Sequence, residues 1–416
     1  MFFRHLVLKR FAKLKNGSLT VVLPDGTKQV YGGLFPGLQA EMRILDGGFF
    51  RRCVLFGAIG FAESFLAAEW ETPDVTKVIA WFLLNSSEAD SPRRNGIFHV
   101  LNLLGRGRHR RHSNSRRRKT HRSQFDPGNE FFQLWLDPTM AYSSGYFDAP
   151  ETSLEAAQVR KYDLLCRKLH LSQTDEVLEI GSGWGGFSIH AARHYHCKVT
   201  TITGSEDQFA GAAERIEAAG LADQIDILLC DYRSIRGRFD KVVSIETLEA
   251  IGDRRVNGFF EKVDEVLKPN GLLALQAILC ADRRYPILRD GVTFVQKHIR
   301  PGALPMCTAR IGEAIVASGD LNLLDYEDMA PHYAQTFKIW RENFESNLAG
   351  VRALGFDDVF VRKWRYYLCC GEAAFGTRHL TVARMVFSRP HNTRLVSPVY
   401  TTLQTEHVHP PADARA

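Results

Sequence analysis

The stretch that decides the fold is Val177–Phe187, which reads Val-Leu-Glu-Ile-Gly-Ser-Gly-Trp-Gly-Gly-Phe. Its apolar first residues predict a short buried parallel strand, and a helical pattern follows the glycines as far as His194. Glycines crowded into such a turn let backbone N–H groups approach a ligand beside a helix N-terminus. The spacing Gly-x-Gly-x-Gly-Gly is not the dinucleotide-binding pattern. Alone, the stretch predicts either a nucleotide-type site or no more than a tight connection between strand and helix.

Predicted strands and helices alternate along the chain after this turn. Besides 177–180, strands are predicted at 198–203, where Val199 and Ile202 are the apolar residues, and at 225–229, 241–245, 272–278 and 380–387. Residues 279–330 are predicted to form an insertion with helices. This alternation indicates an α/β fold with a doubly wound, mostly parallel sheet, in which ligands bind beyond the carboxyl ends of the strands. The polar residues at or near those ends are Glu179, Thr203, Asp231 and Glu246.

The basic charge of the chain is concentrated in one segment. The chain has 416 residues and a net charge of +6, but nine Lys and Arg residues lie within 106–122, and the rest carries about −3. The segment is a solvated linker, a contact for anionic phospholipid at ~1 kcal/mol per basic residue, or a nucleic-acid or nuclear-targeting tract. No aromatic residue interleaves the arginines, which disfavours base stacking, so no nucleic-acid partner is expected.

Composition excludes several classes of protein. The chain is 45% hydrophobic and 24% charged, as in globular proteins of two or three domains. Its eight cysteines include no Cys-x-x-Cys pair, so neither a metal site nor a disulfide framework is expected. No apolar stretch approaches the ~18 residues that span a bilayer.

The first 100 residues predict a small α+β unit without a catalytic constellation. A strand is predicted to end in the turn at Asp25-Gly26, and helices are predicted over 57–70 and from Asp74 to Leu84. The charged first ten residues predict either the first helix of this unit or a short amphipathic surface helix.

An ordered set of motifs resembles the cyclopropane-fatty-acyl-phospholipid synthases and mycolic acid cyclopropane synthases. The matching stretches are 125–132, 136–140, 142–147, 178–187, 231–233, 248–252, 331–336 and 366–368. The resemblance implies a seven-stranded Rossmann-like methyltransferase sheet with a small α+β N-terminal accessory domain. It also implies the domain limits, namely a lipid-contact accessory domain at 1–105, a basic linker at 106–123, the methyltransferase domain at 124–390, and a tail at 391–416 that is predicted to be disordered.

The resemblance also implies the ligands. S-adenosylmethionine is the expected methyl donor, and an unsaturated acyl chain of a phospholipid, entering a hydrophobic tunnel, is the expected acceptor. The predicted cofactor-binding residues are Tyr142, Ser143, Glu179, Gly181, Gly183, Thr203, Gln208, Asp231 and Tyr232. A cytoplasmic enzyme, peripheral at the anionic inner membrane surface through the basic segment, is expected. The sequence leaves open whether the enzyme forms a homodimer.

In the family's reaction, the sulfonium methyl adds to an alkene carbon, and a protein-held bicarbonate ion removes a proton from the new methyl group to close the ring. Glu249 matches the family's carboxylate and Tyr333 its tyrosine. Ser144 and Gln276 stand where a cysteine and a histidine are expected, and Gly371 replaces another cysteine. Serine and glutamine still donate hydrogen bonds, so bicarbonate stays possible, but the three changes together count against ring closure. The predicted catalytic residues are Glu249, Tyr333, Ser144 and Gln276.

The sequence therefore predicts methyl transfer to an unsaturated acyl chain, giving a cyclopropane or a methyl- or methylene-branched chain, with Glu249 controlling the fate of the cation. Two alternatives stay open. One is a methyltransferase of the same fold that acts on a different hydrophobic molecule. The other is a homologue that binds S-adenosylmethionine or lipid without catalysis.

Overall fold

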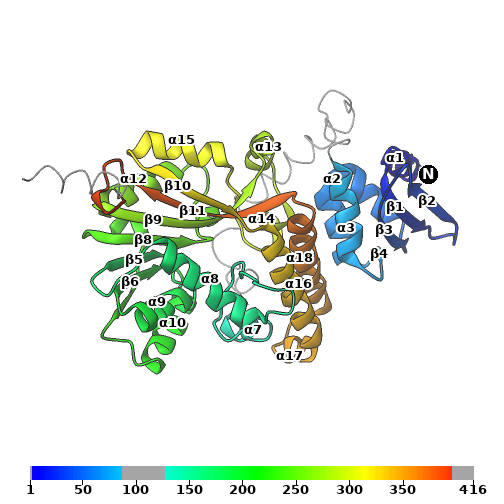
Figure 1. The fold of residues 1–416 in the computed structure, drawn as a ribbon. Helices are drawn as coiled ribbons and strands as arrows, with labels where there is room; N and C mark the ends of the chain where they lie inside the picture. The colour runs from blue at the N-terminus through cyan, green and yellow to red at the C-terminus, as the bar shows by residue number, and fades with distance from the viewer. Residues whose placement is uncertain (1, 87–126, 396–416) are drawn as a thin grey trace, which may run out of the picture.

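A computed structural model describes residues 2–86 and 127–395 (Figure 1). The predicted basic linker at 106–123 lies outside the described residues. Figure 1 shows residues 2–86 as a lobe beside a larger α/β body. Within the described residues, none of the helices is both long and apolar enough to span a membrane.

The N-terminal lobe is an α+β unit, as predicted. Its elements are α1 (Phe2–Phe11), β1 (Asn16–Val22), β2 (Lys28–Gly32), β3 (Phe35–Ile44), α2 (Gly48–Leu66), β4 (Trp70–Glu71) and α3 (Val75–Leu84). The sheet order is β2-β1-β3-β4, with β1 and β2 joined as an antiparallel hairpin at the predicted turn. Val7 and Phe11 are buried, so α1 belongs to the core of this lobe.

One helix of the lobe differs from its prediction. The helix predicted over 57–70 begins at Gly48, is kinked at Gly57 and ends at Leu66. Trp70 instead lies in β4 and pairs with Ile44. Its indole packs on Phe61 and is fully buried, so tertiary packing overrides the helical pattern there.

The larger body is built on a seven-stranded sheet. Its strands are β5 (Glu176–Ile180), β6 (Lys198–Thr203), β7 (Ile225–Leu229), β8 (Phe239–Ile245), β9 (Leu267–Cys280), β10 (Asn322–Asp328) and β11 (Leu380–Ser388). The order is β10-β11-β9-β8-β5-β6-β7, and β11 is antiparallel to both of its neighbours. The doubly wound, mostly parallel sheet is confirmed. Only β10 was not predicted, because it is an edge strand whose residues are mostly exposed and so lacks a buried apolar run.

Helices cover both faces of this sheet (Figure 1). The helices are α7 (Asn129–Gln133), α8 (Leu154–Lys168), α9 (Gly186–Tyr195), α10 (Glu206–Ala218), α11 (Leu248–Ile251), α12 (Val256–Val266), α13 (Tyr285–Asp290), α14 (Phe294–His298), α15 (Thr308–Ser318), α16 (Ala330–Ser346), α17 (Leu348–Ala353) and α18 (Asp358–Gly376). In Figure 1, α9 and α10 lie on one face, and α12 and α15 lie on the other. Residues 391–395 include a short 3₁₀ turn, and Asn392 is buried there, with hydrogen bonds to Asn270 and Ser388.

The two parts of the molecule meet along α18 and α14. Helix α3 packs on α18, where Thr76 donates a hydrogen bond of 3.1 Å to Glu372. On α2, the Glu63 carboxylate accepts hydrogen bonds from Lys297 and His298 of α14. These contacts fix the lobe against the helices that pack beside the sheet.

Candidate active site

The glycine turn after β5 requires glycine at its first position. Gly181 has φ +98°, and a Cβ atom there would lie 2.1 Å from the Thr247 hydroxyl oxygen. Gly183, at φ +49°, faces open space, with no atom within 4 Å of where its Cβ would lie. The turn therefore presents bare backbone at the carboxyl end of β5, beside the first turn of α9.

The next two strand ends carry the other predicted cofactor residues. At β6, the Thr203 hydroxyl donates to the side-chain oxygen of Gln208 at 3.0 Å. After β7, the half-exposed Asp231 carboxylate forms a two-point ion pair with Arg233 at 2.7 and 2.8 Å. The Tyr232 hydroxyl is buried without a hydrogen-bond partner among the described residues. The strand order brings these predicted residues to one edge of the sheet, as a nucleoside site requires.

Glu179 lies one residue before the end of β5 and is buried. One oxygen of its carboxylate accepts hydrogen bonds from the Ser188 and Thr201 hydroxyls, the latter at 2.7 Å. Burial raises the pKa of Glu179 to about 7, against those hydrogen bonds. Glu179 therefore ties α9 and β6 to the central strand.

Tyr142 and Ser143 lie in the segment before α8, and both are tied to protein partners. Tyr142 donates a hydrogen bond of 2.8 Å to the Tyr367 hydroxyl and packs among aromatic rings, including that of Trp340. The Ser143 hydroxyl accepts a hydrogen bond of 2.7 Å from Lys161. Burial lowers the pKa of this lysine to about 7.

Three predicted catalytic residues meet at a carboxylate that was not among them. Glu246 Oε1 accepts hydrogen bonds from the Ser144 backbone N–H at 2.9 Å and from Gln276 Nε2 at 2.8 Å. Glu246 Oε2 accepts the hydroxyl of Tyr333 at 2.6 Å. All four residues are buried. We call Glu246, Glu249, Ser144, Gln276 and Tyr333 the carboxylate centre.

Glu249 forms the second acidic group of this centre. Glu249 Oε1 accepts the backbone N–H of Ile278, and its Oε2 is buried without a hydrogen bond from the described residues. Burial, followed by the nearby charge of Glu246, raises the pKa of Glu249 to about 7. Burial also raises the pKa of Glu246, against the hydrogen bonds of its three donors. Two carboxyl groups so close titrate as a pair.

The centre explains the departures from the family pattern. The Ser144 N–H, Gln276 and Tyr333, which would be available to a bicarbonate ion, are hydrogen-bonded to Glu246 instead. A Cβ at Gly371 would lie 2.4 Å from the ring of Phe337, so this ring fills the space of the expected cysteine. The residues present therefore do not fit a bicarbonate ion held by those donors.

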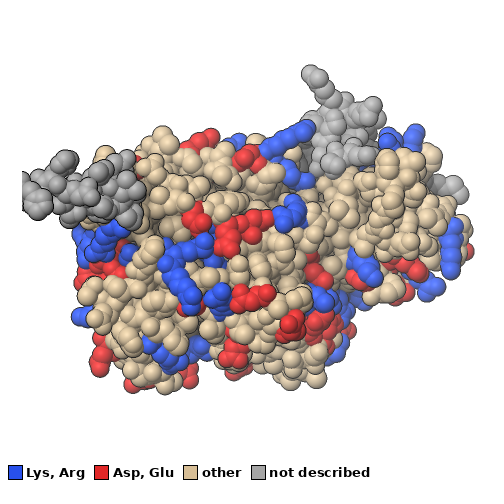
Figure 2. All heavy atoms as spheres, viewed as in Figure 1, with Lys and Arg blue, Asp and Glu red and all other residues tan. Residues whose placement is uncertain are grey.

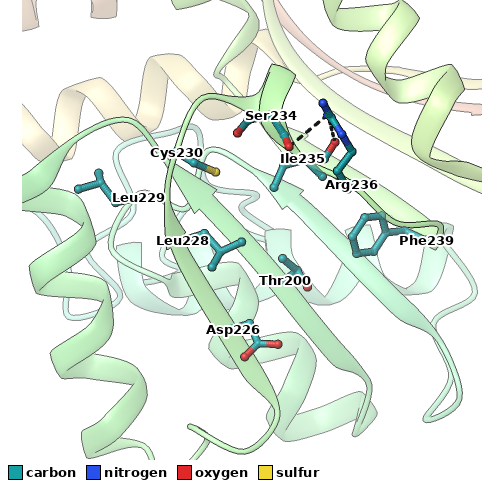
Figure 3. A pocket seen from close by; sticks show the side chains of 9 residues that line it. All are labelled: Thr200, Asp226, Leu228, Leu229, Cys230, Ser234, Ile235, Arg236 and Phe239. Atoms are coloured by element: carbon teal, nitrogen blue, oxygen red, sulfur yellow. Dashed lines mark hydrogen bonds between the residues drawn. The ribbon is translucent and has the colours of Figure 1, made fainter.

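A surface hollow of about 560 Å³ lies elsewhere on the sheet (Figure 3). Its lining includes Thr200 of β6, Leu228 of β7 and Phe239 of β8, and none of the carboxylate centre. The β7–β8 connection contains only the 3₁₀ turn Tyr232–Ser234, so no long helix covers the sheet there. We call the predicted cofactor residues at the ends of β5, β6 and β7 the cofactor wall, namely Gly181, Gly183, Thr203, Gln208, Asp231 and Tyr232. The hollow touches this wall only next to Asp231, at Cys230.

Comparison with known proteins places the chain in a family. The sequence model described as mycolic acid cyclopropane synthetase matches residues 112–385, well over half of the chain. This chain belongs to the mycolic acid cyclopropane synthetase family. It is 36% identical to tuberculostearic acid methyltransferase UfaA1 of Mycobacterium tuberculosis, over 89% of this chain and 88% of the relative. It is 30% identical to the cyclopropane-fatty-acyl-phospholipid synthase of Escherichia coli, over 84% of this chain and 88% of that protein.

Solved structures of the mycolic acid cyclopropane synthetase family share the fold. Cyclopropane synthase MmaA2 from Mycobacterium tuberculosis superposes with a TM-score of 0.60 at 27% identity, over 64% of this chain and 96% of that one. Mycolic acid cyclopropane synthase CmaA1, solved with SAH and CTAB, has a TM-score of 0.60 at 26% identity, over 65% of this chain and 99% of that one. The chain is accordingly an S-adenosylmethionine-dependent methyltransferase, with S-adenosylmethionine as the methyl donor. The open backbone at Gly183 and the buried free Tyr232 hydroxyl fit such a ligand.

Sequence reasoning missed how two buried charged residues are placed near this site. It grouped Glu246 with the polar residues at the strand ends, whereas the structure places Glu246 between the predicted catalytic donors. It did not single out Lys161, which is buried with Ala157 and Leu165 on one face of α8. A lysine within an apolar helical stripe was the available signal.

Proposed function

We propose that this enzyme transfers the methyl group of S-adenosylmethionine to the double bond of an unsaturated fatty acyl chain carried by a phospholipid. The product is a cyclopropane or a methyl- or methylene-branched chain. The observation that carries the proposal is a pair of buried carboxyl groups among aromatic rings, next to the glycine turn. The names of the two relatives, a tuberculostearic acid methyltransferase and a cyclopropane-fatty-acyl-phospholipid synthase, support an acyl acceptor.

The surroundings of the carboxylate centre suit a cationic intermediate in an apolar chain. The Tyr333 ring stacks on Phe375 at 4.4 Å and packs on Phe337 at 4.8 Å between ring centroids. Buried aromatic faces stabilise nearby positive charge, and a site without water protects a carbocation from hydration. An alkene needs no deprotonation before it attacks the methyl group, so positioning supplies most of the catalysis.

Two features of the chain support a phospholipid acceptor at the inner membrane surface. On the N-terminal lobe, the apolar side chains of Val30, Leu34 and Phe35 are exposed around the β2–β3 turn. Figure 2 shows Lys and Arg intermingled with Asp and Glu on the displayed face, so that face carries no wholly basic area. The concentrated basic charge of the chain is in residues 106–122. Apolar contacts together with a polybasic segment are the two signals that stable peripheral binding requires.

Mass spectrometry tests the proposal. Pure protein is incubated with methyl-labelled S-adenosylmethionine and vesicles of unsaturated phospholipid, and the acyl chains are then analysed. We expect a labelled chain heavier by one CH₂ group, and proton NMR then separates a ring from a methylene branch of the same mass. If S-adenosylhomocysteine forms only with a soluble hydrophobic acceptor, the phospholipid proposal is wrong and the alternative acceptor holds.

Deletion of residues 106–122 tests the membrane part separately. We expect the shortened protein to lose activity on anionic vesicles and to keep it on a detergent-dispersed acyl substrate. Neutral vesicles serve as the control, because electrostatic attraction to them is absent. Equal losses of activity on anionic vesicles, neutral vesicles and the detergent-dispersed substrate would show that the segment supports the fold and not the membrane contact.

A further inference from the structure

The Glu246 carboxylate occupies the place of an external anion in the carboxylate centre. It accepts a backbone N–H, a side-chain amide and a phenolic hydroxyl, from Ser144, Gln276 and Tyr333, at 2.6 to 2.9 Å. The donors come from three segments that are far apart in the chain and converge on two oxygen atoms. A carboxylate and a bicarbonate ion present the same pair of acceptor oxygens, so one replaces the other in such a nest.

The backbone at Glu246 is consistent with a functional role for this side chain. Its φ angle is +50°, in the left-handed region that favours glycine. A residue other than Gly, Asn or Asp in this conformation strains the backbone, and strained residues concentrate at functional sites. The Glu246 N–H donates to the Gln276 carbonyl at 2.7 Å, which helps to hold the conformation. A glycine would adopt this conformation without strain. The glutamate at this position therefore indicates that its carboxylate has a function.

We propose that Glu246 is the proton acceptor of the reaction, a built-in base that makes bicarbonate unnecessary. This inference rests on the proposed function. As the alkene π electrons form the new C–C bond, the S–C bond breaks, and its electron pair leaves with S-adenosylhomocysteine. The neighbouring carbon is then cationic. Glu246 takes a proton from the new methyl group, and the freed electron pair closes a cyclopropane ring or, after a hydride shift to the cation, forms a methylene double bond.

Glu246 fits this role better than Glu249. Both Glu246 oxygens are held by donors that fix the direction of the carboxylate. Among the described residues, only one Glu249 oxygen accepts a hydrogen bond, from the Ile278 N–H. Glu249 therefore acts on Glu246 through charge, whereas Glu246 is the group positioned for proton transfer.

The test uses the full chain in carbonate-free buffer under argon, with and without added bicarbonate. We expect the wild-type rate of labelled lipid formation to be the same in both. Glu246→Gln keeps the size of the side chain but removes the base, so its turnover should fall about 10²- to 10⁴-fold. Glu246→Gly should also be slow, and added formate or bicarbonate should restore part of its rate by entering the vacated nest.

The outcomes are separable. A wild-type enzyme that forms no labelled lipid in either buffer refutes the proposed function. Three results would overturn only the inference about Glu246. The first is a wild-type enzyme that is active with bicarbonate and inactive without it, and the second is full turnover in Glu246→Gln. The third is a Glu246→Gly variant that is fast without added anion or that no small anion rescues. Calorimetric binding of S-adenosylhomocysteine should be unchanged in both variants. Glu372→Gln, at the contact with the N-terminal lobe, is the matched glutamate control and should keep the wild-type rate.

Discussion

The cofactor wall and the carboxylate centre lie at the same edge of the sheet but are built in opposite ways. The wall uses consecutive strand ends between 181 and 232, and its acidic residue Asp231 is 46% exposed and paired with Arg233. The centre is assembled from separate segments around 144, 246, 276 and 333, and its two glutamates are only 5–8% exposed. One region follows the order of the chain, and the other depends on long-range packing.

This difference determines the electrostatics of the two regions. The hydrogen bonds from Arg233, with its charge, lower the pKa of Asp231 to about 2. Burial, followed by the nearby charge of Glu246, raises the pKa of Glu249 to about 7, and no ion pair with this group is found among the described residues. The wall thus holds a permanent charge near water, whereas the centre holds a carboxyl group that changes charge near neutral pH.

The largest effect is expected from Gly181→Ala in the wall. Its methyl group would meet the Thr247 hydroxyl at 2.1 Å, and φ +98° is strained for alanine. We expect the free energy of unfolding to fall by about 4 kcal/mol, with loss of S-adenosylhomocysteine binding. Urea unfolding and calorimetry measure the two effects.

Gly183→Ala is the matched control for that variant. Gly183 also has positive φ but faces open space, so the cost to folding should be about 1 kcal/mol. Its methyl group enters the space proposed for the ligand, so the affinity for S-adenosylhomocysteine should still fall. An unchanged affinity would show that the ligand does not approach this backbone.

The contrast also explains what the sequence could predict. The strand 198–203 was predicted with its observed limits because it is rich in β-branched residues, including the buried Val199 and Ile202. Edge strand β10 gives no such signal, and exposed Leu323 and Leu324 interrupt the expected pattern. Trp70 was placed in a helix because its neighbours 57–66 are helical, whereas its own position depends on distant Ile44.

The same limit applies to the site. The residue types and motif positions of Glu249, Tyr333, Ser144 and Gln276 were sufficient to single them out. That three of them converge on Glu246 could not be predicted, because the hydrogen bonds span 30 to 102 positions of sequence. The loss of the cysteine at Gly371 likewise became understandable only when Phe337 was seen against it.

Glu249→Gln should separate stability from catalysis in the centre. The pKa of Glu249 is raised to about 7 in the fold, above its ordinary value of 4.5. Its stabilising contribution is therefore present below pH 4.5 and is lost as the pH rises through about 7. At pH 8 the variant should be up to about 3 kcal/mol more stable than the wild type, and at pH 4 the two should agree.

Turnover of the same variant should fall, because the charge next to Glu246 is lost. Urea unfolding at both pH values and single-turnover assays measure the two effects. A variant with undiminished turnover would remove Glu249 from the mechanism. Equal stabilities at pH 8 would show that burial does not raise the pKa of Glu249.

Gly371→Ala tests the packing that replaced the family's cysteine. The added methyl group would lie 2.4 Å from the Phe337 ring, which is held by Phe375 and Trp340. Overpacking should lower the free energy of unfolding by about 2–3 kcal/mol. Adding Phe337→Leu should recover part of the loss, since the smaller side chain makes room. Additive losses in the double variant would mean that the two positions do not touch.

The smallest effect is expected at the contact between the lobe and the larger body, far from both regions in sequence. Against the effect of burial, hydrogen bonds from His298 and Lys297 lower the pKa of Glu63 to about 2. Its stabilising contribution is present above pH 4.5 and is lost as the pH falls towards 2. Allowing for solvent screening, Glu63→Gln should cost about 1–2 kcal/mol at pH 7 and progressively less below pH 4.5.

Urea unfolding at pH 7 and pH 3 measures this difference. Asp25→Asn, which removes the exposed ion pair with Arg4, is the control and should change the stability little. Turnover per folded molecule should stay at the wild-type level in both variants, because neither residue belongs to the wall or to the carboxylate centre. If Glu63→Gln loses turnover and Asp25→Asn does not, α14 transmits the position of the lobe to the active site. The cofactor wall and the carboxylate centre would then depend on the contact with the lobe.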